Sequence, residues 1–206
     1  MPKVVDHEER RQQLAQAVWS ITAHRGLDAV SLRAVAAEAG VSMGTVQHYF
    51  GNKEQLIQQS GRYMIELANS MANDSRQNSA EPADPRTVIE AVVHQTLPLD
   101  EAQRVGSAVW LAFVARAAVD PELAKLISES WVGLHELIAG QLRTAQRESK
   151  VSAAIDVDHE AATIVAVTDG LVSHLLVGHY TVDSAKAIVE EHLDRIFSVR
   201  AWRKRF

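Results

Sequence analysis

The chain has 206 residues, 47% of them hydrophobic and 23% charged, which is typical of globular proteins with a sizeable core and excludes fibrous and disordered classes. It contains no cysteine, so disulfides, thiolate zinc sites and cysteine nucleophiles are excluded. The net charge of −5 argues against bulk electrostatic binding to nucleic acid, and the aromatic content of only 5% favours packed helices over a β-sandwich.

Three short helices are predicted within the first 52 residues. Glycines mark their ends, and Ser31 and Ser42 stand where the N-caps of the second and third helices belong. In each helix the apolar residues recur at the spacing of one buried face. These residues are Leu14, Ala17, Val18 and Ile21 in the first helix, Leu32, Val35, Ala36 and Ala39 in the second, and Val46, Tyr49 and Phe50 in the third.

A long helix is predicted to follow from about residue 52, with Leu56, Tyr63, Leu67 and Met71 on one face. The polar stretch at residues 73–86 contains two prolines and predicts a loop. No later segment has the pattern of paired strands, so the sequence predicts an all-α fold of about nine helices. The remaining helical segments are residues 87–97, 101–119, 121–148, 159–180 and 183–199.

Charge divides the chain into two parts. Residues 1–53 carry a net charge of +1 and residues 54–206 a net charge of −6, an asymmetry that suggests two roles. We therefore expect two domains, residues 1–53 and residues 54–206. The polar first residues lack the apolar stretch of a signal peptide, so we expect a cytoplasmic protein with no membrane association.

The strongest motif joins the second and third predicted helices through Gly40, with the spacing of a helix-turn-helix. Residues 40–56 read GVSMGTVQHYFGNKEQL, and residues 26–36 read GLDAVSLRAVA. Together these strings closely resemble the signature of TetR-type transcriptional regulators over residues 8–56. The resemblance implies a helix-turn-helix DNA-binding protein rather than an enzyme, with no catalytic residue, cofactor or metal. It also implies a DNA-binding domain at residues 1–53 and a helical effector-binding and dimerisation domain at residues 54–206.

The third helix is the predicted recognition helix, because small and polar residues let a backbone approach base edges in the major groove. Gln47 departs from the family pattern, which most often has an aromatic hydroxyl there, and glutamine can read an adenine edge. Three of these residues have a purely structural alternative to DNA contact. Tyr49 could be a core aromatic, His48 an exposed residue without a role, and Lys53 a solvated charge. From motif and resemblance together, the candidate DNA-binding residues are Ser31, Arg33, Ser42, Met43, Gly44, Thr45, Gln47, His48, Tyr49 and Lys53.

A homodimer is expected, because two recognition helices reaching successive major grooves about 34 Å apart would bind a palindromic double-stranded DNA operator. Similar regulators dimerise through their last two long helices, here 159–180 and 183–199. Gly170 would permit close helix approach there, and the alternative is an ordinary monomer core. The residues expected to be buried at this interface are Ile164, Val165, Val167, Leu171, Val172, Leu175 and Leu176, with Glu190, Glu191 and Asp194 at its rim. The basic residues 202–205 are interpreted as a solvated tail rather than a DNA arm.

Residues 97–101, 109–113 and 120–123 resemble the effector domain of BetI-like members of this family. An unknown small-molecule effector is therefore expected, and the candidate pocket residues are Trp110, Phe113, Arg116, Trp131, His135, Asp169 and His174. The structural alternatives to ligand binding are core packing for the aromatics, an ion pair between Arg116 and Asp169, and hydrogen-bonded structural roles for the histidines. A carboxylate with aromatics would suit a quaternary amine, and an apolar tunnel would suit a fatty ligand.

The leading functional hypothesis is a repressor whose effector moves the helix at residues 54–71 and so changes the separation of the recognition helices. An enzyme using His174 is the weaker alternative, since no hydrolase, phosphate-loop or metalloprotease motif is present. His174 and His179, five residues apart, should face different sides of one helix. A third hypothesis is a regulator that acts through a protein partner without a small ligand.

Overall fold

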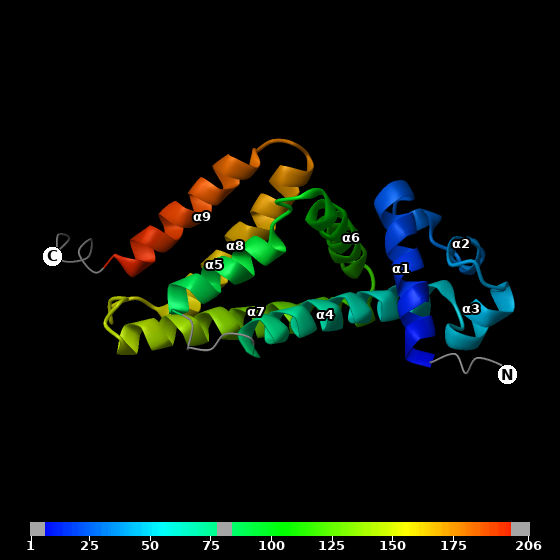
Figure 1. The fold of residues 1–206 in the computed structure, drawn as a ribbon, viewed down its shortest axis with the longest axis horizontal. Coiled ribbons are helices and arrows are strands. Elements are labelled where there is room, and N and C mark those ends of the chain that lie inside the picture. Colours follow the sequence, from blue (N-terminus) through cyan, green and yellow to red (C-terminus); the bar gives the residue numbers. More distant parts are fainter. Residues whose placement is uncertain (1–6, 78–83, 199–206) are drawn as a thin grey trace. The chain divides into compact units, whose positions relative to one another are not determined.

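The structure of the protein, a computed structural model, describes residues 7–77 and 84–198 (Figure 1). Throughout these ranges the regular elements are helical, which confirms the all-α prediction of about nine helices. The predicted basic tail at residues 202–205 lies outside the described residues. The helices are α1 (His7–Arg25), α2 (Leu32–Glu38), α3 (Met43–Tyr49), α4 (Lys53–Gln77), α5 (Pro85–Thr96), α6 (Glu101–Ala117), α7 (Pro121–Arg147), α8 (Val157–Leu176) and α9 (Val182–Phe197), with a 3₁₀ turn η1 (Leu27–Ala29).

The predicted loop at residues 73–86 is wrong at both ends. Helix α4 continues to Gln77, because polar side chains do not prevent a helix whose backbone hydrogen bonds are intact. Helix α5 begins already at Pro85, where the missing backbone N–H needs no partner, and the Asp84 carboxylate accepts from the N–H groups of Arg86 and Thr87. In the described part of the chain, no helix is both long and apolar enough to cross a membrane.

The chain divides into two compact units. The first comprises Met1–Asn73 and Ala108–Ile127, and the second comprises Asp74–Ser107 and Ser128–Phe206. Helices α6 and α7 therefore contribute residues to both units. The assignment of separate roles to residues 1–53 and 54–206 stays a prediction.

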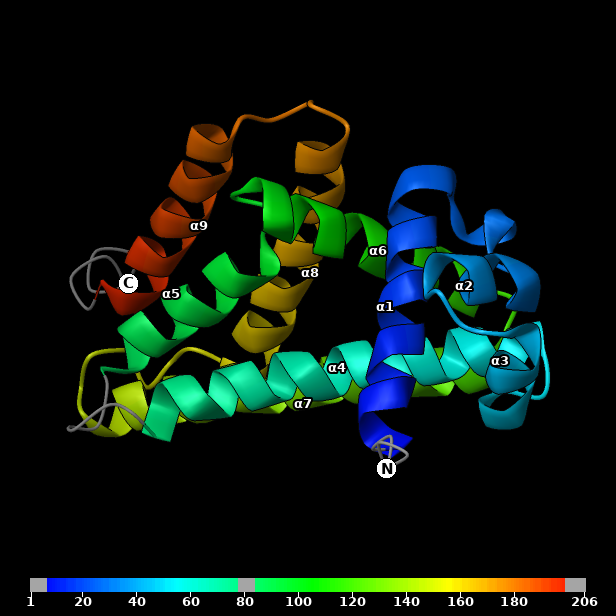
Figure 2. The same cartoon turned by 45° about the vertical axis from the view of Figure 1, so that its right-hand side comes forward.

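In the first unit, α1 crosses the N-terminal part of α4 (Figures 1 and 2). The Trp19 ring stacks on Tyr63 with 5.6 Å between ring centroids, and its indole N–H donates to the Ser60 carbonyl over 3.2 Å. Gly61 permits a close approach on α4, since a Cβ there would lie 3.2 Å from Leu123 and 3.6 Å from Phe113. These contacts fix the start of α4, and with it the short helices that precede it.

The second unit is built around α8, with α5 and α9 beside it (Figures 1 and 2). Its buried core includes four of the residues expected at a dimer interface, namely Ile164, Leu171, Val172 and Leu175. These four residues belong to the core of a single chain, which was the alternative to a dimer interface, because α5, α7 and α9 of the same chain supply their packing partners. Val165, Val167 and Leu176 are only partly buried, and Glu190, Glu191 and Asp194 are exposed.

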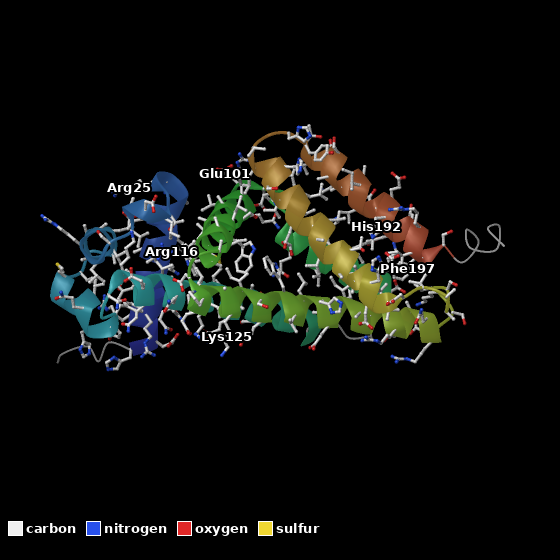
Figure 3. The ribbon with its side chains drawn as sticks, turned by 180° about the vertical axis from the view of Figure 1, so that it is seen from behind. Arg25, Glu101, Arg116, Lys125, His192 and Phe197 are labelled. Atoms are coloured by element: carbon white, nitrogen blue, oxygen red, sulfur yellow. The ribbon has the colours of Figure 1, made fainter. Side chains whose placement is uncertain are left out.

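Polar contacts tie the ends of the helices in this second unit. The Arg104 guanidinium donates to the carbonyls of Leu175 and Leu176, which end α8 and have no partner within the helix. Arg86 forms ion pairs with Glu90 and Asp194. His192, which lies on α9 (Figure 3), has its imidazole 3.6 Å from Glu160, and burial lowers the pKa of that ring. Hydrogen bonds and ion pairs near the surface thus hold the helices of the second unit together, in addition to its buried apolar core.

Candidate nucleic-acid interface

Helices α2 and α3 are joined by a tight turn that fixes their relative placement. Gly40 has φ = +64°, a conformation that glycine adopts without the strain of a side chain, and the Val41 N–H returns to the Ala36 carbonyl over 3.0 Å. Ser42 then caps α3, with its hydroxyl accepting from the Thr45 N–H over 3.0 Å. This is the helix-turn-helix that the sequence predicts.

Helix α3 has a buried and an exposed face. Val46 is fully buried and Phe50, just after the helix, is 4% exposed, so these two side chains anchor it in the core of the first unit. Met43, Gly44, Gln47 and His48 are exposed, and within residues 7–77 and 84–198 Gln47 makes no side-chain hydrogen bond. A surface of this kind, polar at Gln47 and His48, small at Gly44 and apolar at Met43, can enter a major groove and leaves the glutamine amide available to a base edge.

Three of the predicted contact residues are already held by neighbours. The Thr45 hydroxyl lies 2.9 Å from that of Ser42. The Tyr49 hydroxyl lies 2.9 Å from Nδ1 of His7 and its ring is half-buried, so Tyr49 is not the core aromatic of the alternative reading. The Lys53 ammonium donates to the Asp28 carbonyl over 3.1 Å, which places a fixed positive charge at the start of α4.

The start of α4 is fixed by reciprocal capping. The Gln55 N–H donates to the Asn52 side chain over 2.8 Å, and the Gln55 side chain accepts from the Gly51 N–H over 3.0 Å. Neither Asn52 nor Gln55 was singled out from the sequence, although an asparagine followed three residues later by glutamine is a capping-box pattern that could have found them. The capping orients Lys53 without the help of DNA.

Beside α2 the surface is hollowed. Ser31 caps α2 by accepting from the Ala34 N–H over 3.1 Å, so its hydroxyl proton stays available to an acceptor. Arg33 is exposed two residues after Ser31, and the exposed Arg25, at the end of α1 (Figure 3), was not among the residues predicted from the sequence. The concavity has a volume of about 440 Å³ and is lined by Arg25, Ser31, Arg33, Ala34, Ala37 and Glu38.

Two family models match this chain. Residues 16–59 match the model described as bacterial regulatory proteins of the tetR family, and residues 85–198 match the model of the BetI-type transcriptional repressor C-terminal domain. The chain belongs to the TetR family. It is accordingly a helix-turn-helix transcriptional regulator, as its relatives are.

Individual relatives of this TetR-family protein agree along most of its length. The regulator PksA of Bacillus subtilis is 28% identical over 200 residues, covering 95% of this chain and 94% of the relative. The regulator BetI of Burkholderia cenocepacia is 31% identical over 171 residues, covering 83% and 84%. A transcriptional regulator from Rhodococcus sp. RHA1 has a solved structure with a TM-score of 0.79 and 26% identity, covering 90% and 95%.

A fourth likeness bears on effectors. A transcriptional regulator from Saccharomonospora viridis, solved in complex with choline, superposes with a TM-score of 0.82 at 24% identity and covers 91% of this chain and 97% of its own. At that identity the likeness shows that the two chains share a fold. Choline binding is an observation on that protein alone.

The residues predicted to line an effector pocket in this TetR-family chain are distributed over both compact units. Trp110, Phe113 and Arg116 belong to the first unit, where Phe113 is fully buried in the core. Arg116 on α6 (Figure 3) lies 3.9 Å from Asp120, four residues further along the chain, and the alternative of an ion pair with Asp169, a residue of the other unit, stays a prediction. Asp120 is itself buried and caps the start of α7 by accepting from the Leu123 N–H.

The other four pocket candidates lie in the second unit, which brings only two of them together. The Trp131 side chain lies close enough to Asp169 to lower the pKa of its carboxyl, but burial of the carboxyl has the larger effect and raises that pKa. His135 is bound instead to the Asp158 carbonyl at 3.0 Å. His174 is exposed near the end of α8. The pair Trp131 and Asp169 is therefore the part of the predicted pocket that has the perturbed chemistry of a binding site.

His174 and His179 correct another expectation, that they face different sides of one helix. Their ring centroids are 5.0 Å apart, and Tyr180 stacks on His174 at 5.2 Å. The reason is that α8 ends at Leu176, and Gly178, with φ = +75°, turns the chain back so that the His179 N–H donates to the His174 carbonyl. The predicted helix at 159–180 runs three to four residues too far.

Proposed function

We propose that this TetR-family regulator is a repressor that binds a palindromic DNA operator as a homodimer and leaves it when a small-molecule effector binds. The observation that carries the DNA part is the outward face of α3. It exposes Gly44, Gln47 and His48 together with the apolar Met43, while Val46 and Phe50 hold its opposite face in the core. A short helix presented in this way fits a major groove.

Within this proposal the predicted residues have two kinds of role. Met43, Gly44, Gln47 and His48 face base edges, and Gln47 reads adenine through its amide. Ser31, Arg33, Ser42, Thr45, Tyr49 and Lys53 bind backbone phosphates and set the register of the protein on the duplex. Lys53 supports the second role because its ammonium is already oriented by the Asp28 carbonyl.

The dimer is assigned to α8 and α9. Helix α8 exposes Ala162 and Ala166 and leaves Val165 partly buried, a surface of small apolar residues on which a second copy can pack closely. Glu190 and Glu191 on α9 are exposed and suit the polar rim of such an interface. A dimer also doubles the phosphate contacts of a module with a net charge of only +1.

The effector site is assigned to the second unit around Asp169. A half-buried carboxylate whose pKa is raised by burial gains by taking a cationic partner, and the Trp131 indole beside it offers an aromatic face. The choline complex of the Saccharomonospora viridis regulator supports a cationic effector for this chain as well. Release then requires that the effector bind the DNA-free conformation more tightly, with α4 as the moving helix.

The test starts by selecting duplexes from a random DNA pool with the purified full-length chain. The proposal expects a palindromic consensus, a footprint of two protected patches and a dimer in solution by light scattering. A panel of organic cations and fatty ligands should then include a compound that dissociates the complex, with Asp169→Asn losing the response to a cation and keeping DNA binding. Failure to enrich any palindrome would overturn the proposal.

A further inference from the structure

His7, which the sequence patterns did not single out, is packed against Tyr49. Its Nδ1 lies 2.9 Å from the tyrosine hydroxyl, and the two ring centroids are 5.7 Å apart. The ring of His48 also stands edge-on to Tyr49, with 5.2 Å between the ring centroids. The first residue of α1 and the last residue of α3 are thus joined at the surface of the helix-turn-helix unit.

The chemistry of this hydrogen bond decides what the tyrosine can offer to DNA. When the imidazole Nδ1–H donates to the phenol oxygen, the phenol keeps its own proton for an outside acceptor. When Nδ1 accepts instead, the phenol proton is used inside the protein. A phosphate oxygen accepts hydrogen bonds and cannot donate them, so a duplex backbone next to Tyr49 selects the first arrangement.

Holding the ring also has a thermodynamic consequence. An exposed tyrosine with no neighbours loses rotational freedom when its hydroxyl binds a phosphate, and that loss weakens binding. Its contacts with His7 and His48 already restrain the Tyr49 ring before DNA arrives. The restraint favours the bound geometry without adding a direct contact to DNA.

We propose that His7 is a positioning residue for DNA binding, which holds the Tyr49 hydroxyl with its proton directed to a backbone phosphate of the duplex. This inference rests on the proposed function and adds to it a residue of α1 that no resemblance assigns. It implies that His7 contributes to affinity through Tyr49 and contributes nothing when the hydroxyl is absent. Because the contact is with a phosphate, the contribution is the same on every sequence.

The experiment measures duplex binding by fluorescence anisotropy with full-length protein at low salt. The probes are a mixed-sequence duplex and the palindrome selected above. We expect Tyr49→Phe and His7→Leu each to weaken binding about three- to tenfold on both probes, the range of one lost hydrogen bond. The double variant should bind within about twofold of Tyr49→Phe alone, because the two changes remove one coupled contact.

Two further variants separate positioning from folding. His7→Asn places an amide nitrogen near the position of Nδ1 and should restore binding to within about twofold of the unchanged chain, because it can still donate to the phenol. His24→Leu is the matched control, an exposed histidine on the same helix whose Nδ1 contacts the Ser20 carbonyl of that helix, and it should bind as the unchanged chain does.

The outcomes distinguish this inference from the function on which it rests. An unchanged chain that binds neither probe contradicts the proposed function, and the role of His7 with it. An unchanged chain that binds, with His7→Leu binding equally well, contradicts the role of His7 alone. So does a His7→Leu effect that persists undiminished in the Tyr49→Phe background.

Discussion

The outward face of α3 and the surroundings of Asp169 are both polar, but they affect stability in opposite ways. On α3 the polar side chains are exposed, and packing comes from Val46 and Phe50 on the other face. Asp169 is half-buried, and burial raises the pKa of its carboxyl. The face of α3 can therefore change without loss of stability, whereas burial disfavours the charged form of Asp169, which is the reason for proposing it as the effector-binding group.

The largest effect on stability should come from a change on the buried face of α3. Phe50→Ala should lower the free energy of unfolding by about 3–5 kcal/mol, because it removes a buried aromatic and leaves a cavity. Urea denaturation of the variant and the unchanged chain measures the difference. A loss below about 1 kcal/mol would mean that the inner face does not anchor α3, and the contrast between its two faces would not hold.

On the outer face the predicted effect concerns recognition. Gln47→Ala should leave the melting temperature unchanged and reduce discrimination at one base pair of the selected palindrome by about 1–3 kcal/mol. Competition binding with single-base variants of the palindrome measures this directly. An equal loss of affinity on all sequences would instead assign Gln47 to the backbone.

Phosphate contacts should give a smaller and different signature. Thr45→Ala and Lys53→Ala should weaken operator binding while leaving the dimer intact, and Lys53→Ala should reduce the slope of log affinity against log salt by about one unit per lost phosphate contact. Titrations at several salt concentrations give the slope. Arg147→Ala, at an exposed arginine of the second unit, removes the same charge and is expected to leave the slope unchanged.

The smallest predicted effect is a gain in stability, rather than a loss, when Asp169 is replaced. Its pKa is raised above the ordinary 3.8, so the unfolded chain ionises first and the folded state loses stability as pH rises through the raised value. Asp169→Asn should therefore stabilise the protein at pH 7 by less than about 1 kcal/mol, given the partial solvent screening. Thermal melts should show this gain shrinking as the pH falls towards 4. A destabilised variant at neutral pH would mean that the charge supports the fold.

The sequence predicts the helical parts of this molecule well, because helix periodicity and caps are local. Ser31 and Ser42 cap α2 and α3 as expected, and Val46 and Phe50 are buried as the spacing predicts, whereas Tyr49 is only half-buried. The predictions fail where the turn between two helices or the pairing of distant side chains determines the structure. The turn at Gly178 brings His174 and His179 together, and Arg116 has a partner in Asp120, the residue that precedes α7.

Two features of the candidate sites could not be derived from the pattern at all. His7 reaches Tyr49 across 42 residues, and only the crossing of α1 over its neighbours brings them into contact. The pocket candidates are distributed over two compact units, because α6 and α7 contribute to both. Periodicity identifies a buried face, and it does not identify the partner that covers that face.

A footprint on the selected duplex tests the central claim most directly. Hydroxyl-radical cleavage in the presence of the full-length chain should show two symmetric protected patches whose centres are about 34 Å or a multiple apart, as expected for two copies of α3 in successive major grooves. The same experiment with Gln47→Ala should keep the spacing and lose the preference at one base pair. Uniform cleavage with no protected patch would contradict the account.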